Sequence, residues 1–177
     1  MDRELQRRLL TFVRPLYQDL DGSSRLDDVE RVARIARTIH RPATGEEERE
    51  FELLLLFHGL GKWLERVGNA SRTALAVEGV SESELRSVAS SAARLDNPRT
   101  ANERAVATAI LIDNAGVRGL AHRFAGARRE GHSLTDVVRE VLADSWIPEW
   151  VPAEAREMLE RRFEVRRKFC SALIEEL

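Results

Sequence analysis

Three polar side chains stand near the starts or ends of predicted helices, and together they could bind a metal or move a proton. Asp28 lies at the start of one helix, His58 follows the apolar run 53–57, and Asp113 follows the apolar run 109–112. A neutral imidazole binds metals and titrates near neutral pH, and carboxylates add oxygen ligands. The simpler interpretation of His58 is a histidine that hydrogen-bonds a carbonyl in a packed interior.

Asp113 needs either solvent or a partner, because burying an unpaired carboxylate is costly. A helix end that emerges into solvent would satisfy it, and so would a cation. The candidate cations are Arg31, Lys62, Arg118 and Arg123. An aspartate that reaches the surface or pairs with an arginine fits the sequence at least as well as a functional one.

Composition places the chain among ordinary globular proteins. It has 177 residues, of which 43% are hydrophobic and 33% charged, which suits one domain with a real core. A net charge of −2 gives no general attraction to nucleic acid or to an anionic membrane. No apolar run approaches the roughly 20 residues of a transmembrane helix. The N-terminal residues lack the layout of a secretory signal, so we expect a cytoplasmic protein.

Apolar residues recur with helical spacing along nearly the whole chain, and no alternating run is long enough to predict a strand. Residues 19–24 are predicted to form a turn, with Ser24 or Asp27 as the following cap, and Ser81 with Glu84 forms a capping box. Helices are predicted near residues 3–18, 26–39, 46–60, 71–77, 81–95, 102–113, 120–130, 134–144 and 152–176. We therefore expect one all-α domain over residues 1–177, with a core of about 10–130 and the C-terminal helices 134–177 packed on it.

Two tryptophans and two prolines lie close together in the connection 145–152. Because tryptophan side chains bury a large area, we expect this connection to pack on the body of the protein. If Trp146 and Trp150 lie on the surface instead, they would mark an interface, for example that of a homodimer.

Three short segments resemble the motifs of the HD-domain metal-dependent phosphohydrolases. They are Asp28 with Arg31-Val32, the stretch Leu56-Phe57-His58-Gly59-Leu60-Gly61-Lys62, and Ile112-Asp113-Asn114. The resemblance implies an all-α bundle of bacterial type. In that family the metal ligands are a histidine, a His-Asp pair and a later aspartate.

Two of the family's metal ligands are different residues in this chain. Asp28 stands where the family has its first histidine, and Gly59 replaces the aspartate of the His-Asp pair. Glycine has no side chain and cannot coordinate. The remaining set of Asp28, His58 and Asp113 offers two oxygens and one nitrogen, which with water is enough for one ion.

The resemblance and its departures predict a degenerate HD-domain protein without phosphohydrolase activity and without a cofactor. Such a protein would act as a regulatory module that binds a small phosphorylated ligand or a protein partner. The candidate ligand-binding residues are Arg31, Lys62 and Arg123.

The alternative is a divergent phosphohydrolase that acts on a nucleotide or a small phosphoester. It would use a single Mn, Mg, Ni or Zn ion held by Asp28, His58 and Asp113, with Asp27 or Asp96 as additional candidates. His58 and Lys62 would then be the catalytic candidates.

Overall fold

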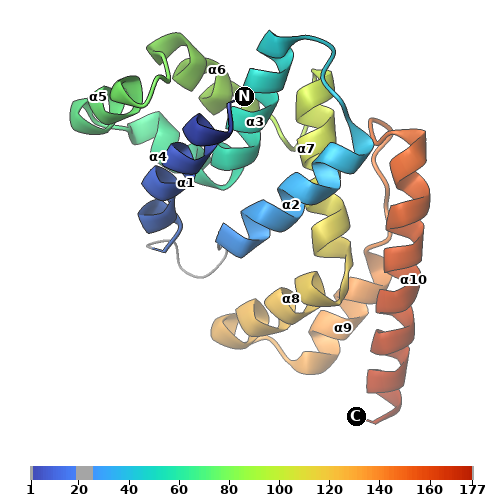
Figure 1. Cartoon of the computed structure of the whole chain (residues 1–177). Coiled ribbons are helices and arrows are strands. Elements are labelled where there is room, and N and C mark those ends of the chain that lie inside the picture. The colour runs from blue at the N-terminus through green and yellow to red at the C-terminus, as the bar shows by residue number, and fades with distance from the viewer. Residues whose placement is uncertain (1, 19–25, 177) are drawn as a thin grey trace. The chain divides into compact units, whose positions relative to one another are not determined.

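The computed structural model describes residues 2–18 and 26–176 and is all-α over these ranges, as expected (Figure 1). The helices are α1 Arg3–Gln18, α2 Leu26–Ile39, α3 Gly45–Phe57, the 3-10 helix η1 His58–Leu60, α4 Gly61–Arg66, α5 Asn69–Val77, α6 Glu82–Ala92, α7 Ala101–Ala115, α8 Val117–Glu130, α9 Leu134–Ala143 and α10 Ala153–Glu175. The predicted turn at 19–24 lies outside the described residues, as does Ser24. Asp27 lies within the first turn of α2 and is not its cap.

Contacts between residues divide the chain into two compact units, Met1–Ala107 and Thr108–Leu177, and the division falls within α7. Each unit has its own buried apolar cluster. The expectation of one domain, with residues 134–177 packed on a core of about 10–130, stays a prediction.

Helix α3 is the centre of the first unit, where it contacts α1, α2 and α6. Its run Leu53–Phe57 is buried without a break. Because neighbouring helices cover several sides of α3, its apolar residues are not confined to one stripe. The core around it contains Leu5, Leu9, Val13, Tyr17, Val29, Leu53, Leu56, Phe57, Leu60, Leu64, Leu75, Val80, Leu85 and Val88.

Capping boxes begin three helices of the first unit. The predicted box of α6 is confirmed, because the Glu84 N–H donates to Ser81 Oγ at 3.2 Å and the Ser81 N–H donates to Glu84 Oε2 at 2.7 Å. The same reciprocal bonds join Thr44 and Glu47 before α3. They also join Thr100 and Glu103 before α7.

Glu84 also binds Arg49 of α3, so its carboxylate fastens α6 to the central helix. The Arg49 guanidinium and the hydrogen bonds from Ser81, acting against partial burial, hold the pKa of Glu84 at about 2. A carboxylate with a depressed pKa stabilises the folded state above its unfolded pKa, and this contribution is lost as the pH falls toward the folded value.

We therefore expect Glu84→Gln to be less stable than the wild type at pH 7, with the difference shrinking as the pH falls from about 4.5 to about 2. Thermal unfolding followed by circular dichroism across this range measures the effect. The matched control is Glu65→Gln, at an exposed position of the same unit. A difference in thermal stability between the wild type and Glu84→Gln that stays constant with pH would contradict the stabilising role of the ionised Glu84.

The second unit contains the end of α7 together with α8, α9 and α10, and the last three helices contact one another. Its core contains Leu120, Val137, Val138, Val141 and Cys170. Arg166 is also buried, with its guanidinium 4.7 Å from the centre of the Phe163 ring and donating to the Asp144 carbonyl. This contact fixes the end of α9 against α10.

In the connection between α9 and α10, the Trp146 side chain does not lie where the sequence predicts. Arg156 of α10 donates to the carbonyls of Pro148 and Glu149 at 3.1 and 3.0 Å and so holds the connection on the unit. The Trp146 side chain nevertheless is 74% exposed, so the prediction that it packs inward is wrong, whereas Trp150 is partly buried. Arg156 therefore holds the backbone of this connection through its carbonyls, while the Trp146 ring lies outside.

Candidate functional site

His58 lies at the junction where α3 passes into η1. Its ring is partly buried, and Nδ1 lies 2.8 Å from the Leu55 carbonyl oxygen, so the expected hydrogen bond to a carbonyl is confirmed. Because a carbonyl oxygen only accepts, Nδ1 carries the proton and the lone pair of the neutral ring is on Nε2. Metal-binding histidines are commonly oriented by the same kind of bond.

Helix α3 ends at Phe57 and the chain continues as the 3-10 helix η1, so the predicted helix 46–60 is divided at this point. Gly59 lies in η1 and Gly61 begins α4. Among the described residues, only Gly79 and Gly131 have a positive φ, so the backbone at Gly59 does not itself demand glycine. A Cβ at Gly61 would lie 3.9 Å from Ala92 Cβ, which is an ordinary contact.

Asp28 and Arg31 are brought together by the structure. Both lie on α2, three residues apart, with Arg31 Nη2 2.5 Å from Asp28 Oδ1. The Asp28 side chain is 15% exposed and that of Arg31 is 22% exposed, so water screens this pair less than a surface pair. A carboxylate held by a guanidinium is a poorer metal ligand, because the cation competes for the same oxygen.

The other predicted residues are spread over both units. Lys62 is exposed in α4, and Asp27 and Asp96 are exposed as well. Asp113 is partly buried on α7 and belongs to the second unit, whereas Asp28 and His58 belong to the first.

Arg123, the third candidate for binding phosphate, is on α8 in the second unit. Its Nη2 lies 2.5 Å from Asp144 Oδ2, and both side chains are about half exposed. The guanidinium therefore already pairs with a carboxylate of its own unit.

Two positions that the HD resemblance assigns to metal ligands have no freely available donor of the expected type. Gly59 supplies no donor, and Asp28 is engaged by Arg31. Within residues 2–18 and 26–176, no group of three or more histidine, cysteine, aspartate or glutamate side chains is arranged to hold a metal ion.

Two polar features of the first unit had no place in the sequence predictions. A pocket of about 290 Å³ lies between α3 and α6; it is lined by Glu46, Arg49, Glu50, Leu53, Ser83, Glu84, Ser87 and Val88. Glu103 is a fully buried carboxylate bound by Arg94. The Thr100-x-x-Glu103 spacing could have indicated its capping role, but nothing in the sequence indicates its burial.

No family model and no curated protein matches the chain. The solved structures similar to it include Bacillus subtilis YpgQ in complex with ADP, at 18% identity and a TM-score of 0.67. This match covers 98% of the present chain and 95% of YpgQ. A selenomethionine form of B. subtilis YpgQ gives a TM-score of 0.63 at 18% identity, covering 98% and 96% of the two chains. At this identity the likeness establishes the all-α fold alone. In the part of the chain that the structure describes, no helix has the length and apolarity needed to cross a membrane.

Proposed function

We propose that the chain is a degenerate HD-like domain that binds a phosphorylated nucleotide and does not hydrolyse it. The observation that carries this proposal is the Asp28–Arg31 pair of 2.5 Å. At the position where the HD family resemblance calls for a histidine ligand, the chain has a carboxylate that an arginine occupies. With Gly59 beside His58, two of the family's metal donors are replaced by residues unsuited to activating water.

The identity of the ligand is supported by the structural neighbour. YpgQ was crystallised in complex with ADP and shares the fold over nearly the full length of both chains. ADP carries anionic phosphates, and Lys62 offers an exposed ammonium four residues after His58. Lysine is a common phosphate-binding residue because its ammonium is a compact charge with three donors.

Binding of ADP to the Lys62→Ala variant tests the proposal. We expect wild-type protein to bind ADP in the presence of a chelator, and Lys62→Ala to bind it about tenfold more weakly, because a hydrogen bond to a charged group contributes about 1.5–3 kcal/mol. Isothermal titration calorimetry measures both affinities. Chromatography of the incubated nucleotide should show that it is unchanged.

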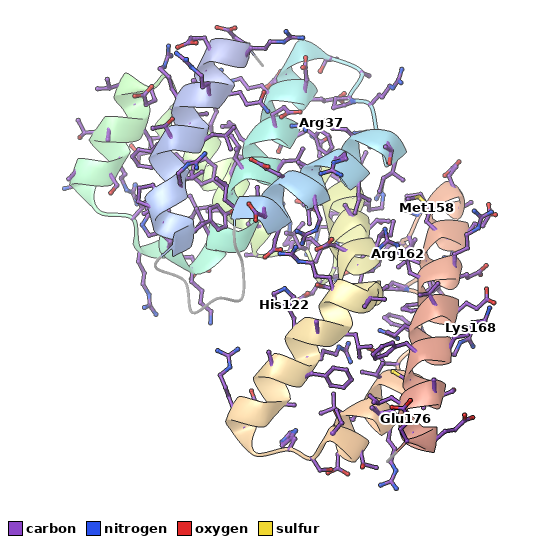
Figure 2. The ribbon with its side chains drawn as sticks, turned by 60° about the horizontal axis from the view of Figure 1, so that its bottom comes forward. Arg37, His122, Met158, Arg162, Lys168 and Glu176 are labelled. Atoms are coloured by element: carbon purple, nitrogen blue, oxygen red, sulfur yellow. The ribbon has the colours of Figure 1, made fainter. Side chains whose placement is uncertain are left out.

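The chain contains a matched control for this experiment, because its only other lysine is Lys168. Lys168 lies on α10, pairs with Glu164 at 2.7 Å, and points away from α8 in Figure 2. Lys168→Ala should bind ADP like the wild type. Equal losses of ADP affinity in Lys62→Ala and Lys168→Ala would reject the proposal. So would the absence of binding by the wild type at millimolar ADP.

A second candidate function is the single-metal phosphohydrolase, and the orientation of His58 favours it. With Nδ1–H donating to the Leu55 carbonyl, Nε2 is the basic atom of the ring, as in a metal-binding histidine. The metal content of the wild-type protein distinguishes the two candidate functions: one equivalent of bound metal would favour the phosphohydrolase, and metal at background would favour the non-hydrolysing domain.

A further inference from the structure

An apolar stripe runs along the exposed surface of α10. Met158, Val165 and Phe169 are 38%, 53% and 45% exposed, although a surface helix normally keeps such side chains on its buried face. They are separated by seven and four residues, so they lie on one side of the helix. Ala172, three residues further on, is exposed on the same side. This stripe is therefore a second apolar face of α10.

The face that α10 buries is formed by other residues. Ala155, Leu159, Phe163 and Cys170 are buried, and their spacing places them on a side of the helix about a quarter of a turn away from the stripe. This buried side serves the contacts of α10 with α8 and α9 in the second unit. The stripe remains uncovered by its own unit.

Arg162 lies between Met158 and Val165 in the stripe, but its guanidinium turns aside. Nη1 lies 2.7 Å from the place that a Cβ on Gly116 would take, so the head group rests against the backbone where α7 passes into α8. In Figure 2, Arg162 and Lys168 lie on different sides of α10. The aliphatic stem of Arg162 therefore continues the apolar stripe, and its charge lies at the edge.

The charge on this side of α10 changes sign from one end of the stripe to the other. Arg161 and Arg162 lie beside its first half, and Glu175 and Glu176 lie at its end. Two copies of α10 packed in parallel would bring like charges together at both ends. Two antiparallel copies would instead place the acidic end of each beside the basic part of the other. Such a contact is self-complementary and two-fold symmetric.

The charged residues beside the stripe have only weak partners on their own helix. Arg161 pairs with Glu157 and Lys168 pairs with Glu164, and all four side chains are more than half exposed. Exposed pairs of this kind contribute little to stability. Arg161 is therefore available to a carboxylate of a second copy, while the charge of Glu164 offsets repulsion between two Lys168 side chains near the two-fold axis.

Residue size also fits an antiparallel pair of helices. In the alternating layers of such a pair, Phe169 of one copy faces Val165 of the other, and Ala172 faces Arg162. The largest apolar side chain then meets a smaller one near the centre of the contact. The small alanine leaves room for the stem of the arginine.

We propose that the stripe of Met158, Val165, Phe169 and Ala172 binds the same stripe of a second copy, with the two α10 helices antiparallel. The stripe extends along about 21 Å of helix, which is short for a permanent interface. The dissociation constant of the dimer should therefore be micromolar. This contact does not depend on the proposed binding of ADP.

Sedimentation equilibrium of the full chain between about 1 and 300 µM tests the proposal. We expect mostly monomer at the lowest concentration and mostly dimer at the highest. Phe169→Glu should raise the dissociation constant at least about tenfold, because the dimer would bury its carboxylate near the centre of the contact. A wild type that stays monomeric would overturn the proposal, as would a dimer that Phe169→Glu leaves unchanged.

The matched control is Ile174→Glu. Ile174 is 40% exposed, close to the exposure of Phe169, but it follows five residues later and so lies about 140° further round α10, outside the stripe. Ile174→Glu should dimerise like the wild type, and circular dichroism should show both variants folded. Equal weakening of the dimer by the two variants would contradict the assignment of the interface to the stripe.

A charge exchange tests the antiparallel direction at two exposed positions where folding is not at risk. Arg161→Glu and Glu175→Arg should each raise the dissociation constant about threefold, because each brings like charges together across the interface. The double variant Arg161→Glu/Glu175→Arg should dimerise like the wild type, since opposite charges face each other again. A double variant as weak as the single variants would overturn the antiparallel contact.

Discussion

The double variant Asp28→His/Gly59→Asp is expected to bind close to one equivalent of Mn²⁺, Ni²⁺ or Zn²⁺, whereas the wild type stays at background. The two substitutions supply an imidazole and a carboxylate at the positions where the HD family resemblance requires them. Asp28→His also removes the carboxylate that pairs with Arg31. Together with His58, the new side chains give a mixed nitrogen and oxygen set that suits these metals.

The local structure should accept both substitutions. Gly59 is partly exposed and does not have the positive φ that would demand glycine, so its backbone conformation is open to an aspartate. Position 28 lies in the first turn of α2 and is partly exposed, and histidine is tolerated in helices about as well as aspartate. The expected change is therefore in metal binding, with little loss of stability.

Elemental analysis after metal loading and desalting gives the result. Gly61→Asp is the matched control, because it adds the same carboxylate two residues away at a position with room for a Cβ. The metal content of Gly61→Asp should stay at background. Metal in the wild type that disappears in His58→Ala would favour the hydrolase candidate, and a double variant without metal would reject the HD-like arrangement.

The sequence predicted local structure well because the signals for it are local. Helical spacing located the helices, and Ser81 with Glu84 located the start of α6. Each of these features depends on a few neighbouring residues and on backbone geometry, so no knowledge of distant contacts was needed.

Burial and pairing were less predictable because they depend on residues distant in the chain. Asp28 and Arg31 are three apart on a helix, a spacing at which ion pairs form, yet Arg31 was assigned only as a ligand-binding residue or a partner of Asp113. Trp146 was expected to pack inward because of its residue type, yet its side chain is exposed, and the backbone beside it is held by Arg156 from α10. The hydrogen bond from the Tyr17 hydroxyl to the Leu56 carbonyl gave no signal in the sequence, because the two residues are 39 apart.

The same limit applies to the capping boxes. Thr44 with Glu47 and Thr100 with Glu103 have identical spacing, but Glu47 is exposed and Glu103 is fully buried. The sequence pattern alone predicts the same contribution to stability for both capping boxes. The energetic difference comes from what surrounds each carboxylate in the folded first unit.

Glu103→Ala should consequently be among the most destabilising single substitutions in the first unit, lowering the free energy of unfolding by about 3 kcal/mol. The Glu103 carboxylate accepts the Arg99 N–H at 2.7 Å, the Thr100 N–H at 3.2 Å and the Arg94 guanidinium at 2.5 Å. Burial acts to raise the pKa of Glu103, but these donors outweigh it and hold the pKa below its ordinary value. Removing the carboxylate leaves two backbone N–H groups and a partly buried guanidinium without their acceptor.

Urea unfolding of Glu103→Ala and Glu47→Ala, followed by circular dichroism, compares the two boxes directly. Glu47→Ala removes the same reciprocal cap at an exposed helix start, where water replaces the lost bonds, and should cost about 1 kcal/mol. Glu103→Gln keeps one acceptor oxygen, and its free energy of unfolding should lie between those of the two alanine variants.

The effect should also depend on pH. Because the pKa of Glu103 is depressed, its contribution to stability is present above the ordinary glutamate pKa and is lost as the pH falls below it. The difference in free energy of unfolding between Glu103→Ala and the wild type should therefore become smaller in acid. Equal losses for Glu47→Ala and Glu103→Ala at neutral pH would mean that burial adds nothing to the cap, and that the contact with Arg94 is an ordinary surface ion pair.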